Sequence, residues 1–436
     1  MDHLGCRSLV IGLLSLGLAA PAFAQRTAGP NAGVLGTTDD ANSRHTFTFR
    51  GSLFGAWDDI LSESADPALD RRFLRSGAAA GAEGGLLHAR RTSRMEWLSS
   101  VNSALRIYGG GDDPAAATFD GRTALTSTLN RRVSYSLSGA VAYSPYYQLA
   151  PSYGLQSQTV GSFDGGFGLA TAAERNVSTD GTAGITVRIS RRDTIEASGT
   201  AKHWDFLDQP ESTVTSYGAS GRYRHSLTGT LGVYAGFGRE EARYKFADDS
   251  DVTSDTIDVG IDYGDTLEFS RRTAVSFGVS TSAVRWNEDT HYRVHGSATL
   301  TRSFGRSGSG LLQYQRGTEY TAGFREPLLT DTFSGGFSDQ IGRDASWSVN
   351  AGYVRGEVGF EADSRRFDVY DIGGRLTKAL TRNLGVFGSY TFYRYEVPAG
   401  ATVFTFMPKF SRQSFSVGVN LWAPLINDAR PPVETP

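Results

Sequence analysis

The side chains of residues 132–144, "RVSYSLSGAVAYS", change character at every second position. Val133, Leu137 and Tyr143 belong to an apolar set, whereas Ser134 and Ser138 belong to a small, polar set between them. A period of two predicts a β-strand whose two faces meet different surroundings. The pattern leaves open whether the apolar face meets a protein core or lipid.

The same alternation returns along the chain, each time after a short polar turn that commonly carries arginine. Examples of these turns are "ARRTSR" from residue 89, "SRRD" from residue 190 and "GRDAS" from residue 342. A turn about every forty residues suits a hairpin with one short turn and one longer loop. The predicted strands cover residues 45–57, 73–88, 94–108, 116–129, 132–145, 177–190, 194–206, 213–225, 229–243, 253–267, 273–286, 290–303, 310–323, 330–341, 345–358, 366–379, 384–397 and 411–424. An alternative places a strand at 159–171, inside what we interpret as one long loop over 146–176.

Strand length distinguishes a strand whose apolar face meets lipid from one whose apolar face meets a protein core. Strands of soluble proteins usually have ~5–6 residues, whereas membrane strands need ~9–11 residues, which most of these segments reach. Aromatic residues recur toward the strand ends, as girdles at a membrane interface do. These aromatics are Trp57, Trp97, Tyr143, Tyr263, Trp286, Tyr353 and Tyr390. We therefore expect an all-β fold, a transmembrane antiparallel up-and-down β-barrel of about 18 strands (16–18), with short periplasmic turns and longer extracellular loops.

The N-terminus is typical of a secretory signal peptide over residues 1–24. Arg7 precedes an apolar run from Leu9 to Leu18, and Ala22-Phe23-Ala24 fits a small-x-small cleavage site. A membrane helix is the alternative, but the run is shorter than the ~20 residues that a span needs. Residues 25–44 are expected to be a disordered periplasmic segment, 45–424 the outer-membrane barrel and 425–436 a periplasmic tail.

Composition narrows the classes of function. The 43 lysines and arginines and 46 acidic residues give a formal net charge of −3, with no basic block that predicts nucleic-acid binding. The 52 glycines exceed the usual share of about 7% and suit a strand-rich chain. The polar segment before residue 45 is too short for a plug domain, which argues against an active receptor.

The hairpin starts "RRVSYSLSG" at Arg131–Gly139 and "RRTAVSFG" at Arg271–Gly278, with "YSPYY" at Tyr143–Tyr147, resemble those of bacterial outer-membrane barrels. In particular the chain is similar to porins of the "β-barrel porin 2" type associated with exopolysaccharide production, over roughly 45–424. One departure is the tail "INDARPPVETP" after the last strand, because such barrels usually end on an aromatic residue.

The resemblance implies a place in the outer membrane of a Gram-negative cell and transport of polar solutes, including polysaccharide export. Its implied partners are outer-membrane lipids and lipopolysaccharide, periplasmic chaperones, the barrel-assembly machinery and polysaccharide-export components. The polar faces predict a pore lining of Glu96, Arg106, Asp120, Arg122, Arg188, Glu196, Lys202, Arg222, Arg224, Asp258, Asp262, His291, Arg293, His295, Gln313, Gln315 and Glu319. Both signs of charge occur, so we expect no strong ion preference, and loop 146–176 either constricts the pore or lies on the surface.

Two other functions remain open. A hydrolase in the barrel wall would need an activated nucleophile, but no GxSxG occurs, and His291 and His295 lie ~13 Å apart on one strand, too far to share a metal ion. A surface scaffold or adhesin with a closed lumen would act through its loops. The acidic loop with Asp248, Asp249, Asp251 and Asp255 is either a solvated surface or a site that binds Ca²⁺ or bridges lipopolysaccharide through divalent ions. We predict no catalytic residue, metal site or cofactor.

Overall fold

The structure is a computed structural model. It describes residues 44–61, 76–109, 115–147, 174–209, 212–228, 231–245, 250–263, 272–286, 289–305, 307–320, 324, 326–359, 365–397 and 409–428. The predicted signal peptide, most of the N-terminal segment before residue 45, most of loop 146–176, the alternative strand at 159–171 and the end of the predicted tail lie outside these residues. In the part of the chain described, no helix is both long and apolar enough to cross a membrane.

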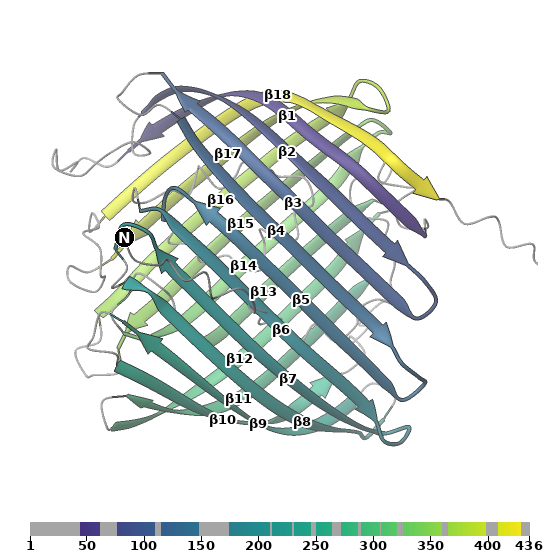
Figure 1. The fold of residues 1–436 in the computed structure, drawn as a ribbon, viewed down its shortest axis with the longest axis vertical. Helices are drawn as coiled ribbons and strands as arrows, with labels where there is room; N and C mark the ends of the chain where they lie inside the picture. Colours follow the sequence, from purple (N-terminus) through teal and green to yellow (C-terminus); the bar gives the residue numbers. More distant parts are fainter. Residues whose placement is uncertain are drawn as a thin grey trace, which may run out of the picture.

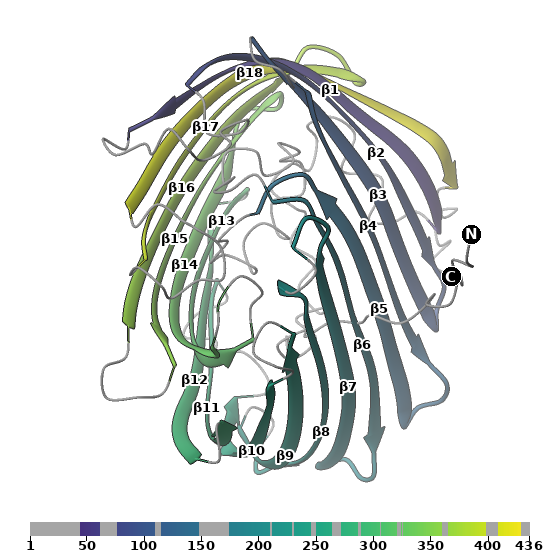
Figure 2. The same ribbon diagram turned by 60° about the vertical axis from the view of Figure 1, so that its left-hand side comes forward.

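Eighteen antiparallel strands form one closed sheet, which confirms the predicted barrel (Figure 1). Every strand pairs with its neighbours in sequence, and β1 also pairs with β18. The strands are β1 His45–Ile60, β2 Gly77–Arg91, β3 Met95–Tyr108, β4 Ala115–Thr128, β5 Val133–Ser144, β6 Asn176–Arg188, β7 Asp193–Phe206, β8 Val214–Ser226, β9 Leu231–Tyr244, β10 Ser250–Tyr263, β11 Thr273–Trp286, β12 Asp289–Phe304, β13 Gly308–Glu319, β14 Leu328–Ile341, β15 Ala345–Val358, β16 Arg365–Ala379, β17 Leu384–Glu396 and β18 Lys409–Asp428. Figure 2 shows the two sides of the wall, with β13–β17 facing β3–β8 and β9–β11 joining them.

The barrel closes where β1 and β18 lie side by side (Figures 1 and 2). Their ladder runs from His45 opposite Asp428 to Ile60 opposite Arg412, with a register shift between Phe47 and Thr48. β18 thus extends beyond the predicted end at residue 424, because its last residues still pair with the start of β1. A closed ladder leaves no strand edge unpaired, as a barrel in lipid requires.

Alternate side chains along each strand meet opposite surroundings. On β1, Leu53 is 68% exposed, whereas its neighbours Ser52 and Phe54 are buried. On β5, Leu137 is exposed and Ser138 is buried, so the strand has the two unlike faces that its sequence predicts. The exposed apolar positions form the outer wall, because the buried set includes side chains that meet across non-adjacent strands.

An aromatic row crosses four strands on the outer wall. The ring centroids of Tyr314 and Phe333 lie 4.7 Å apart, those of Phe333 and Tyr353 6.2 Å, and those of Tyr353 and Tyr370 4.8 Å. Such a girdle is typical of a membrane interface. Trp286 differs from the predicted girdle, because it packs edge-on against buried Tyr244 inside the barrel, at 6.3 Å between ring centroids.

Short turns join the strands at the rim where the chain enters β1 and leaves β18. In the β4–β5 turn, the Asn130 side-chain oxygen accepts hydrogen bonds from the backbone N–H groups of Arg132 (2.8 Å) and Val133 (3.0 Å). Gly342 supplies a φ of 73° between β14 and β15, a conformation that favours glycine. In barrels of this class, the rim with short turns faces the periplasm.

Candidate functional site

The inner face of the barrel gathers most of its polar side chains. By ladder register, all predicted lining residues with described side chains fall on the inward set: Glu96, Arg106, Asp120, Arg122, Arg188, Glu196, Lys202, Arg222, Arg224, Asp258, His291, Arg293, His295, Gln313, Gln315 and Glu319. The side chain of Asp262 lies outside the described part. The strand register shows that these side chains share the inner face. Whether they contact a transported solute remains a prediction.

Positive charge dominates the inward face near the short-turn rim. Arg222 pairs with Asp258 across the strands, and its guanidinium lies 4.4 Å from the ring centroid of Tyr234. The inward cations of this half are Arg50, Arg91, Arg122, Arg188, Arg222, Arg224 and Arg375, and the inward described acids are Glu96, Glu196 and Asp258. The charges are therefore sorted along the barrel axis rather than mixed evenly.

Three carboxylates lie near one lysine, between the arginine-rich half and the long-loop rim. Lys202 of β7 interacts electrostatically with Asp180 of β6, Glu240 of β9 and Glu319 of β13. The Glu319 carboxylate also accepts a hydrogen bond of 3.0 Å from the Thr330 hydroxyl. These groups put a negative zone above the arginine-rich half of the lumen.

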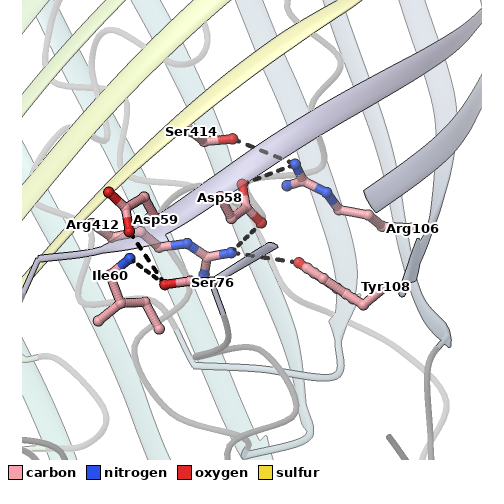
Figure 3. Close-up of polar contacts among 8 residues, drawn as sticks. All are labelled: Asp58, Asp59, Ile60, Ser76, Arg106, Tyr108, Arg412 and Ser414. Carbon is pink, nitrogen blue, oxygen red and sulfur yellow. Dashed lines mark hydrogen bonds and ion pairs between the residues drawn. The ribbon is translucent and has the colours of Figure 1, made fainter. Parts of the chain in front are cut away.

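One buried network joins three strands at the closing seam (Figure 3). Asp58 of β1 accepts hydrogen bonds from Arg106 of β3 (3.1 Å) and from Arg412 of β18 (2.6 Å). Arg106 also donates to the hydroxyl of Ser414 at 3.4 Å, and Arg412 donates to that of Tyr108 at 3.5 Å. Because the three charged side chains are at most 2% exposed, they brace the wall rather than contact solvent.

The alternating pattern predicts Arg106 as a lining residue, but it does not predict the residues to which Arg106 hydrogen-bonds. Asp58 and Arg412 are 354 positions apart, and only the closing register brings them together. Buried Glu83, which accepts a hydrogen bond of 2.8 Å from Ser52, was also missed. The period-two pattern marks each as inward, but it does not tell which charges meet.

The inner face near the long-loop rim is apolar, which the predicted polar lining does not anticipate. One cluster of buried residues runs around this end: Tyr147, Phe206, Val214, Ala242, Tyr244, Val252, Val284, Phe324, Leu328, Val354, Val358, Phe367, Val369, Tyr393, Tyr395, Val397 and Phe410. Tyr147 follows β5, and its ring centroid lies 5.9 Å from that of Phe206 on β7. These packed apolar side chains line the inner wall at this level, where they offer few hydrogen-bonding groups to water or polar solutes.

The arrangement nearest to a hydrolytic site lies on the short-turn rim. Asp193 accepts hydrogen bonds from Tyr223 (2.6 Å) and from the Ser190 hydroxyl, and His225 Nδ1 lies 2.7 Å from the same carboxylate. A catalytic triad needs the histidine between serine and acid, whereas here the aspartate lies between the other two. The group therefore serves to fix the β6–β7 turn to β8.

The described residues contain no group of three or more histidine, cysteine or acidic side chains placed to hold a metal ion. His295 instead lies within hydrogen-bond distance of Ser282 (3.0 Å) and Thr318 (3.2 Å) through Nε2. This histidine therefore has partners of its own on the neighbouring strands, β11 and β13.

No protein-family model matches the chain, and no curated protein matches it. Among solved structures, OccAB3 of Acinetobacter baumannii is 8% identical with a TM-score of 0.40, over 86% of this chain and 99% of that one. OpdQ of Pseudomonas aeruginosa is 11% identical at 0.40, over 88% and 99%, and the siderophore receptor PirA of the same organism is 9% identical at 0.40, over 87% and 80%. These values are too low to indicate a function, which therefore has to come from the residues of this chain.

The chain is thus an eighteen-stranded β-barrel of the transmembrane type, with an apolar outer wall. Its lumen is divided into an arginine-rich half, a carboxylate zone around Lys202 and an apolar end with buried Tyr147 and Phe324.

Proposed function

We propose that this protein forms a gated, porin-like conduit for polar solutes across the outer membrane. The observation that carries the proposal is the closed barrel of eighteen strands with charged side chains on its inner face. Barrels of about 16–18 strands enclose an aqueous channel unless something fills them. Polar side chains bind and release solutes by exchangeable hydrogen bonds, which suits saccharides, and an exopolysaccharide is our preferred cargo.

The apolar cluster supports a gate at the long-loop end. Tyr147, Phe206 and Phe324 are fully buried there, and we propose that movement of these rings opens and closes the path. We expect the resting conductance to be low and intermittent for this reason.

The test is single-channel conductance of the refolded mature protein in a planar bilayer, with and without neutral oligosaccharides. Openings of nanosiemens scale that sugars block would support the conduit. A folded barrel that stays silent, even after Tyr147→Ser and Phe206→Ser are combined, would contradict it.

A surface scaffold with a closed lumen is the second candidate. The observation that favours it is the buried Asp58–Arg106–Arg412 network with the apolar end, since both stiffen the barrel and neither needs a solute. A scaffold predicts no conductance in either protein, and a cellular defect that follows changes in the extracellular loops.

A barrel-wall hydrolase is disfavoured. The Ser282 hydroxyl lies 3.0 Å from His295 Nε2, but within the described ranges no carboxylate lies within hydrogen-bond distance of that imidazole. A serine nucleophile needs a histidine that an acid orients from its other nitrogen. The pair of Ser282 and His295 therefore lacks the third member of a triad.

A further inference from the structure

A cavity of about 410 Å³ opens at the short-turn rim, and its lining includes residues from both faces of the wall. It lies where three strands of the closing seam meet, at the end of β18, the start of β1 and the end of β2. The lining residues are Arg44, His45, His88, Arg90, Arg91, Thr92 and Asp428. Neither the conduit nor the scaffold uses this cavity.

The backbone around the cavity is held by ladder hydrogen bonds. The N–H of Arg44 donates to the carbonyl of Asp428 at 3.0 Å, and the N–H of Arg91 donates to the carbonyl of Arg44 at 2.7 Å. His45 lies opposite both Arg90 and Asp428 in the register. The cavity is therefore part of the barrel wall rather than a gap between loose ends.

The charge of the lining is positive. Arg91 is neutralised by Glu96 at 2.7 Å, and Asp428 lies 4.0 Å from the imidazole of His45. Arg44 and Arg90 are exposed and form no ion pair with any residue of the described ranges. Two guanidinium groups thus offer their donors to a ligand with anionic oxygens, such as a phosphate group.

Three rings in edge-to-face contact run from the cavity to the outer wall. The ring centroids of His45 and His88 lie 5.2 Å apart, and those of His88 and Trp97 lie 4.9 Å apart. Trp97 is 39% exposed on the outer wall. An exposed tryptophan at this rim marks the level of lipid headgroups.

A strip of small residues lies farther along the outer wall, separated from the cavity by the outward side chains of Phe47, Phe49 and Leu86. By register, Ala78, Ala80, Ala82 and Gly84 of β2 lie on the outward set beside Gly51 and Gly55 of β1. The exposed side chains of Leu53 and Leu105 flank the strip, and nothing lies within 4 Å of a Cβ built on Gly55. An extended hydrocarbon chain fits such a strip, because it contacts the wall without displacing large side chains.

We propose that this seam binds an anionic phospholipid of the periplasmic leaflet. Its phosphate lies between Arg44 and Arg90, its headgroup lies beside His88 and Trp97, and an acyl chain follows the strip. Charge complementarity at headgroup depth, with the apolar outer wall of β1 and β2 beside it, favours a lipid over a second copy of the chain. The assignment depends on the short-turn rim facing the periplasm.

The test is native mass spectrometry of the full mature barrel, refolded in detergent with dioleoyl phosphatidylglycerol or dioleoyl phosphatidylcholine. We expect one retained phosphatidylglycerol. Replacing Arg44→Gln and Arg90→Gln should reduce its retention by about fivefold per arginine, the effect of one basic side chain near an anionic lipid surface. The matched control is Arg131→Gln with Arg132→Gln, the same charge change in another turn of this rim.

A second pair of variants tests the acyl strip. Ala82→Phe should lower retention of phosphatidylglycerol, whereas Ala219→Phe, on the outer wall at β8, should not. Three outcomes would overturn the proposal. The barrel could retain phosphatidylglycerol and phosphatidylcholine equally, or both arginine double variants could lose phosphatidylglycerol to the same extent. The third outcome is a dimer of the barrel that added lipid does not displace. Conductance is recorded on the same samples, so that a failure of lipid binding can be distinguished from a failure of the proposed conduit.

Discussion

Asp58 of β1 and Arg412 of β18 meet at the closure of the barrel, with Oδ2 and Nη2 2.6 Å apart and both side chains fully buried. Arg106 approaches the other oxygen of the same carboxylate at 3.1 Å. One anion therefore compensates two cations from strands on either side of β1, and the first strand is linked to the last by charge as well as by its ladder.

Replacing Asp58→Asn should destabilise the barrel by about 3–5 kcal/mol, because two buried guanidinium groups lose their counter-charge. The measurement is the free energy of unfolding in urea from lipid vesicles. Asp344→Asn is the control, since its pairing with Lys378 at 3.9 Å is exposed and should contribute about 0–1 kcal/mol. A loss for Asp58→Asn no greater than that of the control would contradict the bracing role.

The orientation of the wall predicts a depth-dependent penalty for charge. Leu53→Arg on the outer face should cost about 2–4 kcal/mol in a bilayer, because the guanidinium must leave water or distort the lipid. Ser136→Arg, on the inner face of β5, should cost much less. Folding equilibria in vesicles compare the two, and similar penalties would mean that the faces are assigned wrongly.

The apolar end predicts variants that open the lumen. Combining Tyr147→Ser with Phe206→Ser removes two fully buried rings that lie 5.9 Å apart, and the fraction of time in the open state should rise by about tenfold, a change of about 1.4 kcal/mol. Single-channel recording measures this fraction. Tyr390→Ser on the outer wall should leave it unchanged, and an effect there equal to that of the double variant would rule out a local gate.

The arginine-rich half predicts an ion preference that the mixed overall charge does not. Arg222→Gln with Arg224→Gln should lower the permeability of chloride relative to potassium by about twofold, since charges in a confined lumen set its selectivity. Reversal potentials in a salt gradient give the ratio. Arg239→Gln, on the outer face of β9, serves as the control. An unchanged ratio of chloride to potassium permeability in the variant with Arg222→Gln and Arg224→Gln would mean that these arginines do not set an ion preference.

The amino-acid sequence by itself determined the strands, their approximate number and their two faces, because side chains alternate at every second residue and lipid demands an unbroken apolar face. The predicted strands agree with those of the structure in their central residues, and their first and last residues differ by a few positions. The second strand was predicted at 73–88 but runs over Gly77–Arg91, since its small residues carry little alternation and its end is fixed by pairing with β1.

Only the tertiary structure decided which side chains meet. The register at closure brings Asp58 to Arg412, and the curvature of the wall brings Lys202 near Glu319, which no local pattern encodes. The apolar end of the lumen was also not predicted, because the alternation inverts at those strand ends. Inward positions such as Phe206 and Tyr395 are apolar there, whereas their outward neighbours Asp205 and Arg394 are charged. Trp286 belonged to that end and not to the girdle, since its surroundings are set by neighbouring strands.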